Sequence, residues 1–203
     1  MSRTTQAERY QGILRAAAQI IARRGYHGAR ISDIAREAGV ADGTVYLYFA
    51  NKEDVLIAVF REGIGGYLRH LDEQLAGAPD AREELRRLVV SHLGYLGSHR
   101  EFAQVTQIEL RQSDGKIRRA IDAIMDPYFR RIDRIVERGR QEGLFLPDVD
   151  RRVARRMIFG TLDQCVTSWV MSRHPYELAS IAPEVTRLLL GGLEGRADQA
   201  STP

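Results

Sequence analysis

Residues 30–52, RISDIAREAGVADGTVYLYFANK, constrain the fold of this chain more than any other stretch. They have the pattern of two short helices joined by a tight turn. One face of the first helix is apolar and consists of Ile31, Ile34, Ala35 and Ala38. Gly39 ends that helix, residues 40–43 make the corner, and the second helix is expected from Thr44 to about Phe49.

A helix of about two turns is not stable alone, so neighbouring elements must hold it in place. Two helices joined by a short turn that contains glycine form the helix-turn-helix pattern, whose second helix can enter the major groove of DNA. The stretch therefore favours a DNA-binding protein. The alternative is a small helical hairpin inside an ordinary all-α core.

The charge distribution agrees with a DNA-binding N-terminal region. The net charge of the whole chain is only +3. Residues 1–52 contain eight Lys or Arg against four Asp or Glu, and the remaining residues contain twenty-two against twenty-three. The excess positive charge thus lies in the segment where contact with phosphates would need it.

The same stretch resembles the N-terminal signature of the TetR family of bacterial regulators. The matching residues are Ile34-Ala35, Ala38-Gly39-Val40, Gly43, Tyr46-Leu47-Tyr48-Phe49 and Lys52-Glu53. The family usually caps the first of the two helices with Thr, and this chain has Arg30 there. Either Ser32 caps the helix one turn late, or Arg30 has become a phosphate contact.

The resemblance implies a site for operator DNA that both short helices build. The expected phosphate anchors are Tyr46, Tyr48 and Lys52. The residues expected near base edges are Asp42, Gly43 and Thr44, with contributions from Arg30 and Ser32.

The rest of the sequence predicts an all-α protein with about nine helices, because apolar residues recur at helical spacing and no strand alternation occurs. The first helix is expected at residues 5–24, before the helix-turn-helix. The later helices are expected at residues 53–75, 81–98, 101–112, 116–142, 151–171 and 183–193. The expected N-caps of three of these helices are Asn51, Asp80 and Asp150.

Two of these helices contain residues that disfavour a regular helix. The helix at residues 53–75 contains Gly63, Gly65 and Gly66, each of which weakens helix propensity by roughly 1 kcal/mol relative to Ala. These glycines indicate either a hinge or a close contact between helices. Pro127 should kink or split the seventh helix.

The expected domains are a DNA-binding region at residues 1–52 and a ligand-binding and dimerisation region at residues 53–195, followed by a disordered tail at residues 196–203. The helix at residues 53–75 would link the two regions and transmit changes between them. The last two helices are apolar beyond a single stripe, which favours a homodimer that reads two DNA half-sites. The family resemblance implies the same interface, and it places a ligand pocket among helices five to seven.

Residues 39–60, 104–114 and 155–171 are similar to the subgroup of TetR-type repressors that control fatty-acid degradation. The resemblance implies that long-chain acyl-coenzyme A is the effector that releases the protein from DNA, with no further cofactor. The candidate residues around the acyl chain are Leu88, Leu93, Leu96, Phe102, Val105, Thr106, Ile121, Met125 and Tyr128. Candidate cations for the phosphates of coenzyme A are Arg86, Arg87, Arg111, Lys116, Arg118 and Arg119.

Other interpretations of these features stay open. Each apolar candidate could be ordinary core, and each arginine could lie on a solvated helix face. The effector could be a different hydrophobic molecule, with an efflux or other catabolic operon as the target. The chain could also be a helical ligand-binding protein whose helix-turn-helix is vestigial.

Neither catalysis nor a metal site is expected. The five histidines lack metal-binding spacing, and Cys165 lies in an apolar helical stripe. No apolar run approaches the ~18–20 residues that span a bilayer, and residues 1–12 lack the apolar core of a signal peptide. A single cysteine fits a reducing compartment, so a cytoplasmic protein is predicted.

Overall fold

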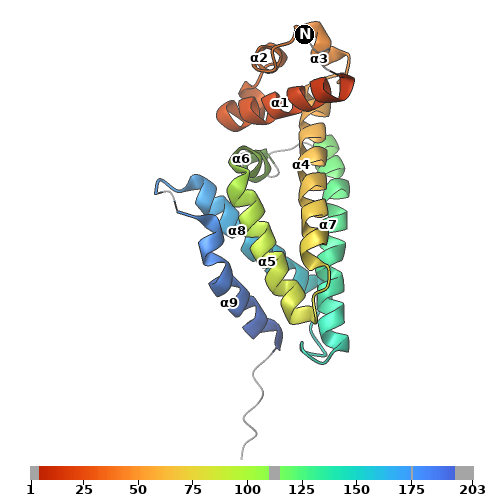
Figure 1. Ribbon diagram of the computed structural model, residues 1–203, viewed down its shortest axis with the longest axis vertical. Coiled ribbons are helices and arrows are strands. Elements are labelled where there is room, and N and C mark those ends of the chain that lie inside the picture. Colours follow the sequence, from red (N-terminus) through yellow and green to blue (C-terminus); the bar gives the residue numbers. More distant parts are fainter. Residues whose placement is uncertain (1–4, 110–114, 175, 195–203) are drawn as a thin grey trace, which may run out of the picture. The chain divides into compact units, whose positions relative to one another are not determined.

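The computed structural model describes residues 5–109, 115–174 and 176–194. Within these ranges the chain forms nine α-helices, one short 3-10 helix and no strand, which confirms the all-α prediction (Figure 1). The α-helices are α1 Gln6–Gly28, α2 Ile31–Glu37, α3 Asp42–Tyr46, α4 Lys52–Leu75, α5 Ala81–Ser98, α6 Arg100–Glu109, α7 Gly115–Gln141, α8 Arg151–Met171 and α9 Ala182–Glu194. The expected tail, Arg111 and the side chain of Lys116 lie outside the described residues. No helix in the described ranges is both long enough and apolar enough to cross a membrane.

The helices pack as two compact units. The first comprises the described residues within 1–66 and 99–125, and the second comprises those within 67–98 and 126–203. Helices α4 and α7 therefore each contribute residues to both units. The division into a DNA-binding region at residues 1–52 and a ligand-binding region beyond it concerns function, and it stays a prediction.

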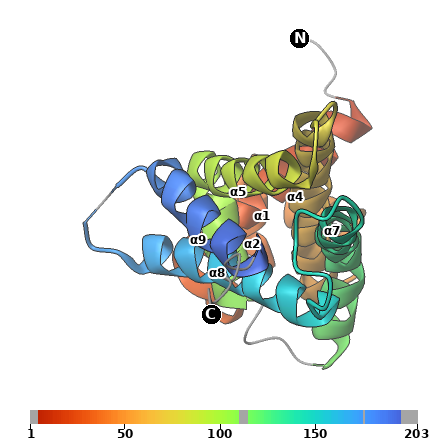
Figure 2. The same ribbon diagram turned by 90° about the horizontal axis from the view of Figure 1, so that it is seen from below.

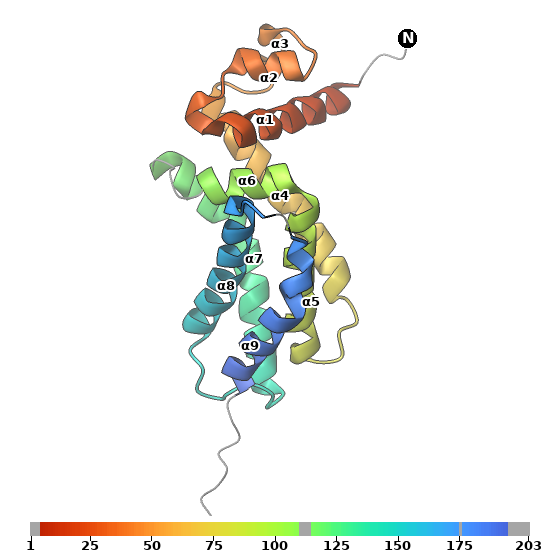
Figure 3. The same ribbon diagram turned by 90° about the vertical axis from the view of Figure 1, so that its left-hand side faces the viewer.

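In the first unit, α2 and α6 pack against α1 (Figure 3). Helix α1 begins with a capping box, in which Thr5 Oγ1 accepts from the Glu8 amide at 3.2 Å and Glu8 Oε2 accepts from the Thr5 amide at 2.7 Å. Its inner stripe includes Ile13 and Ile21, which are fully buried. Burial of this stripe supplies the apolar contacts that the short helices cannot provide alone.

Gly63 lets α4 approach α6 closely within the same unit. A Cβ atom at Gly63 would lie 2.1 Å from Cε2 of Phe102, a distance that a real side chain cannot adopt. Of the two alternatives for the glycines of α4, close packing therefore accounts for Gly63.

In the second unit, α5, α8 and α9 lie side by side (Figures 1 and 2). Helix α8 buries Ile158, Leu162 and Val166 completely. The predicted caps are confirmed, since Asp80 Oδ1 accepts from the Glu83 amide and Asp150 Oδ1 accepts from the Val153 amide, both at 2.9 Å. Asn51 likewise caps α4 through the amide of Asp54, again at 2.9 Å.

One local expectation is wrong, and one alternative in each of two others is excluded. Helix α3 begins at Asp42 and ends at Tyr46, because Asp42 and Gly43 form its first turn rather than a corner. Ser32 does not cap α2, which begins at Ile31 with no side-chain cap recorded for it. Its first turn instead contains the acidic Asp33, whose negative charge suits the positive end of a helix dipole.

Pro127 does not split the seventh helix, because α7 continues through it. Proline removes a single hydrogen bond of the helix, whereas residues on both sides of it are buried within their own units. These residues are Ile121, Met125, Tyr128 and Ile132. A short 3-10 helix at Leu178–Ile181, which the sequence did not indicate, leads into α9.

Candidate operator-binding and effector-binding residues

The two short helices of the first unit depend on a few buried residues for their position. Val45 of α3 is fully buried, and Phe49 just after it is 5% exposed. The ring of Tyr10 on α1 stacks on Phe49 with 5.5 Å between ring centroids. The five-residue α3 is therefore held by its neighbours, and its remaining side chains are free to face a ligand.

A buried carboxylate fastens α2 to α1. Asp33 is 7% exposed, and its Oδ2 accepts from Arg24 Nη1 on α1 at 2.5 Å. Arg36 pairs with the other oxygen, Oδ1. Hydrogen bonds that involve charged groups are among the stronger ones in proteins, so this triad sets the orientation of α2. This triad could not be predicted from the sequence, because an Asp in a first helical turn is ordinary in an exposed helix as well.

Most of the expected base-edge residues lie at the surface. Arg30, Ser32, Asp42 and Gly43 are exposed, and Thr44 is half-buried. On the last turn of α3, Tyr46 is 57% exposed. The next residue, Leu47, is 81% exposed and was missed as a candidate contact.

The other two residues that were expected to anchor phosphates, Tyr48 and Lys52, hold part of the unit together. Tyr48 donates to the carbonyl of Gln6 at 3.4 Å. Lys52 Nζ donates to the carbonyls of His27 and Ala29 at 3.3 and 3.2 Å, and it lies 4.5 Å from the ring centroid of Tyr26. An ammonium group has three donors, so Lys52 can hold these carbonyls and still donate to a phosphate.

The effector candidates fall in both units. In the first unit Val105, Ile121 and Met125 are buried, and Thr106 donates its hydroxyl to the carbonyl of Ala103 at 2.9 Å. Phe102 is half-buried over Gly63, while Arg118 and Arg119 are exposed. In the second unit Leu88, Leu93, Leu96 and Tyr128 are all buried.

The arginines expected on α5 pair with acidic groups. Arg86 and Arg87 both donate to Glu83, at 2.6 to 2.7 Å. These bonds from two guanidinium groups lower the pKa of Glu83 to about 2. Arg87 also donates to the carbonyls of Gln74 and Ala76, so it ties the end of α4 to α5.

A buried cluster of polar aromatic residues in the second unit was not predicted from the sequence as a cluster. The Tyr67–His92–Tyr128 cluster joins α4, α5 and α7, with ring centroids 5.4 to 5.7 Å apart. Tyr128 OH and His92 Nδ1 are 2.9 Å apart. Burial lowers the pKa of His92 to about 4 and raises the pKa of both tyrosines. The histidine is therefore neutral at pH 7.

The described residues offer little support for a metal site or for a nucleophilic cysteine. Among them, no group of three His, Cys, Asp or Glu side chains is placed to hold a metal ion. Cys165 is half-buried, and burial raises the pKa of its thiol. A raised pKa makes the nucleophilic thiolate less abundant.

Two family models match the chain. The model for bacterial regulatory proteins of the tetR family matches residues 13–59, and the model for the C-terminal region of YsiA-like proteins matches residues 60–192. The chain belongs to the TetR family. Proteins of this family are transcription regulators rather than enzymes, and the helix-turn-helix prediction is thereby confirmed.

Individual proteins that are similar to this chain over most of its length have also been described by function or structure. The fatty acid metabolism regulator protein of Bacillus subtilis (strain 168) is 41% identical over 188 residues, which cover 93% of this TetR-family chain and 97% of that protein. The fatty acid degradation regulator FadR from Bacillus halodurans is 46% identical, with a TM-score of 0.86. FadR from Bacillus subtilis in complex with stearoyl-CoA is 42% identical, with a TM-score of 0.87. Each structural match covers 91% of this chain and 99% of the other.

Proposed function

We propose that this TetR-family regulator is a homodimeric repressor of fatty-acid degradation genes that long-chain acyl-CoA releases from its operator. The observation that carries the proposal is the likeness to the Bacillus subtilis regulator with bound stearoyl-CoA, at 42% identity and over 91% of this chain. A likeness of this extent covers both the DNA-binding region and the helices that follow it.

The operator would be read by the exposed residues of α2 and α3. Tyr46 and Lys52 donate to phosphates, which positions the helices on DNA without reading sequence. Tyr48 joins them by turning its single hydroxyl proton from the carbonyl of Gln6 to a phosphate. Asp42, Gly43 and Thr44 approach base edges, and Arg30 and Ser32 add contacts from α2. Leu47 joins this set, because an apolar side chain that is 81% exposed at the end of α3 can contact a thymine methyl group.

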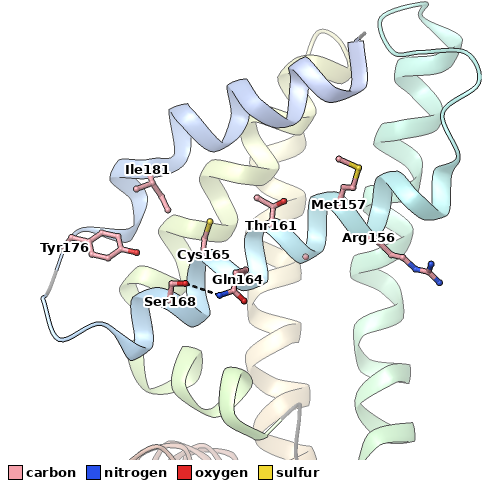
Figure 4. A pocket seen from close by; sticks show the side chains of 9 residues that line it. Arg156, Met157, Thr161, Gln164, Cys165, Ser168, Tyr176 and Ile181 are labelled. Atoms are coloured by element: carbon pink, nitrogen blue, oxygen red, sulfur yellow. Dashed lines mark hydrogen bonds between the residues drawn. The ribbon is translucent and has the colours of Figure 1, made fainter.

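The second copy would dock on α8 and α9. Val153, Met157 and Met171 on α8 are 50, 56 and 77% exposed, and Leu188 on α9 is 60% exposed. Apolar side chains that lie this open along two neighbouring helices are typical of a protein interface. Helix α8 also borders a hollow of about 620 Å³ (Figure 4). Its lining residues include Thr161, Gln164, Cys165 and Ser168. Side chains of a second copy can enter this hollow.

The effector would act by favouring one dimer geometry over another. A dimer reads successive major grooves only while its two recognition helices are about 34–36 Å apart. The effector weakens DNA binding by no more than its differential affinity for the two geometries, which is typically 1–3 kcal/mol. Helix α4 is the covalent route between the operator-reading residues and the second unit, because it contains residues of both units.

A gel-shift titration on the promoter of the protein's own gene tests the proposal. Palmitoyl-CoA and oleoyl-CoA should release the protein from DNA, whereas free fatty acid and free CoA should not. Binding that competitor DNA abolishes would contradict the repressor function. Specific binding that no acyl-CoA relieves would keep the repressor function and contradict the effector.

A further inference from the structure

Among the described residues, buried polar groups that lack partners occur together on α4 and α5 of the second unit. Figure 1 shows these two helices. Tyr67 OH, Ser91 Oγ and His92 Nε2 have no hydrogen-bond partner among the described residues. Their residues are 3, 4 and 6% exposed. A buried polar atom without a partner destabilises a protein, so native proteins rarely leave several of them in one place.

The three groups belong to one neighbourhood. The rings of Tyr67 and His92 are 5.6 Å apart and perpendicular, and Ser91 precedes His92 on α5. The hydroxyl of Tyr67 lies close enough to those of Tyr128 and Ser91 for hydrogen bonding with them to shift its pKa, although neither contact meets the geometry of a formed hydrogen bond. The surrounding residues of α5, such as Leu88 and Leu93, are fully buried and apolar. The cluster is thus a group of polar atoms inside an otherwise apolar core.

The chemistry of the cluster favours a ligand that accepts hydrogen bonds. Both hydroxyls can donate, and when Tyr128 donates to His92 Nδ1 the proton of the neutral ring is on Nε2. A carboxylate is a poor occupant because, among the described residues, the cation that acts on Tyr67 is already paired. Arg131, which acts on Tyr67, is held by Asp72 at 2.5 to 2.7 Å, and the negative Asp163 acts on Tyr128.

We propose that Tyr67, Ser91 and His92 bind the thioester carbonyl oxygen of the acyl-CoA effector. This inference rests on the proposed function and deepens it. A thioester carbonyl is a neutral acceptor with two lone pairs, so it accepts from two of these donors without bringing an unpaired charge into the core. The remaining hydroxyl can then donate to its neighbour within the cluster. The cluster therefore gives the protein a means of distinguishing the CoA ester from the free fatty acid, whose carboxylate is charged at neutral pH.

The test compares two ligands that differ only at the carbonyl. Palmitoyl-CoA has it, whereas the thioether hexadecyl-CoA has a methylene group in its place. Titration calorimetry on the full-length protein, below the micelle concentration of each ligand, gives the ratio of the two dissociation constants. The wild-type protein should bind palmitoyl-CoA about 10- to 100-fold more tightly, because the thioether leaves buried donors without a partner.

Variants then assign the preference to the cluster. Tyr67→Phe and Ser91→Ala should each reduce the ratio severalfold and should weaken binding of the thioether little. Thr186→Val is the matched control, because Thr186 on α9 is also buried with an unpartnered hydroxyl and lies outside the cluster. This control should keep the wild-type ratio.

The outcomes separate this inference from the proposed function. If the wild-type protein binds both ligands equally, or if both cluster variants keep the wild-type ratio, the cluster does not hold the carbonyl and the effector assignment stands. If the wild-type protein binds neither ligand, both the inference and the acyl-CoA effector are overturned. Thermal unfolding without ligand is the second measurement. A large loss of stability in Tyr67→Phe with an unchanged ratio would assign this hydroxyl to the core and overturn its role.

Discussion

Lys52 combines a structural role with its expected contact to DNA. It donates to the carbonyls of His27 and Ala29 and lies over the ring of Tyr26. Lys52→Met, which keeps most of the apolar stem, should lower the free energy of unfolding by about 1–2 kcal/mol through loss of these contacts. Urea denaturation measures this change. If Lys52 also binds a phosphate, the salt slope of operator binding should fall by about one unit.

Arg30 is expected to contact DNA without a structural role like that of Lys52, because it is exposed and its side chain does not cap α2. Arg30→Gln should lower the salt slope and leave the free energy of unfolding nearly unchanged. A stability loss as large as that of Lys52→Met would show that Arg30 has a structural role that the exposed position does not indicate.

His92 makes the stability of the second unit depend on pH. Burial lowers its pKa from 6.5 to about 4, so the unfolded chain binds more protons than the folded protein between these values. Stability from this residue is therefore present above pH 6.5 and is lost as the pH falls toward 4. The free energy of unfolding should fall by about 2 kcal/mol between pH 7 and pH 5, which denaturant titrations at several pH values can measure.

His92→Asn is the control for this pH dependence, because its amide can occupy the place of Nδ1 and does not titrate. The variant should be less stable at pH 7, yet its free energy of unfolding should change less between pH 7 and pH 5. The same pH dependence in wild type and variant would mean that another group causes it. Measurements stop at pH 5 because the carboxylates begin to titrate below that value.

At the scale of elements, the sequence predicts the start of a helix best where the residues that determine it are neighbours in the chain. Asn51, Asp80 and Asp150 cap their helices as expected, because an N-cap involves only the amides two or three residues further on. The start of α3 was missed because Asp-Gly is an ordinary turn signal, and packing of Val45 overrides it.

The contact of α4 with α6 is also beyond sequence reasoning, because Gly63 and Phe102 are far apart in the chain. Gly63→Ala should lower the free energy of unfolding by about 1–3 kcal/mol, because the new methyl group overlaps the ring of Phe102. The double variant Gly63→Ala with Phe102→Leu should recover part of this loss. Denaturant unfolding of the three proteins checks both expectations.

Gly94→Ala is the matched control for Gly63→Ala. Gly94 lies inside α5, and nothing lies within 4 Å of the position of its Cβ. Gly94→Ala should raise the free energy of unfolding by up to ~1 kcal/mol through helix propensity. A Gly63→Ala variant as stable as Gly94→Ala would contradict the close contact with Phe102.

At the scale of the molecule, family and fold could be predicted from the sequence, but the donors of the second unit could not. The helix-turn-helix residues are contiguous, so their pattern is visible along the chain. Tyr67, His92 and Tyr128 come from three helices, and in the sequence each looks like one member of an apolar stripe. Only the fold brings them together, which is why the sequence predicts Tyr128 as a wall residue but does not predict its contacts with Tyr67 and His92.

The proposed dimer gives the prediction that belongs to the whole molecule. Met157 is 56% exposed at the hollow on α8, where a second copy would dock. Met157→Arg should leave the monomer folded, because the side chain is already in solvent, but it would place a charge in an apolar interface. Light scattering after size exclusion should show a monomer, and operator affinity should fall at least tenfold because a dimer binds two half-sites.

Val90→Arg is the control, since Val90 on α5 is also an exposed apolar residue, at 42%. A Met157→Arg protein that stays dimeric would move the interface away from this face of α8, whereas a monomer that still binds DNA tightly would separate operator recognition from dimerisation.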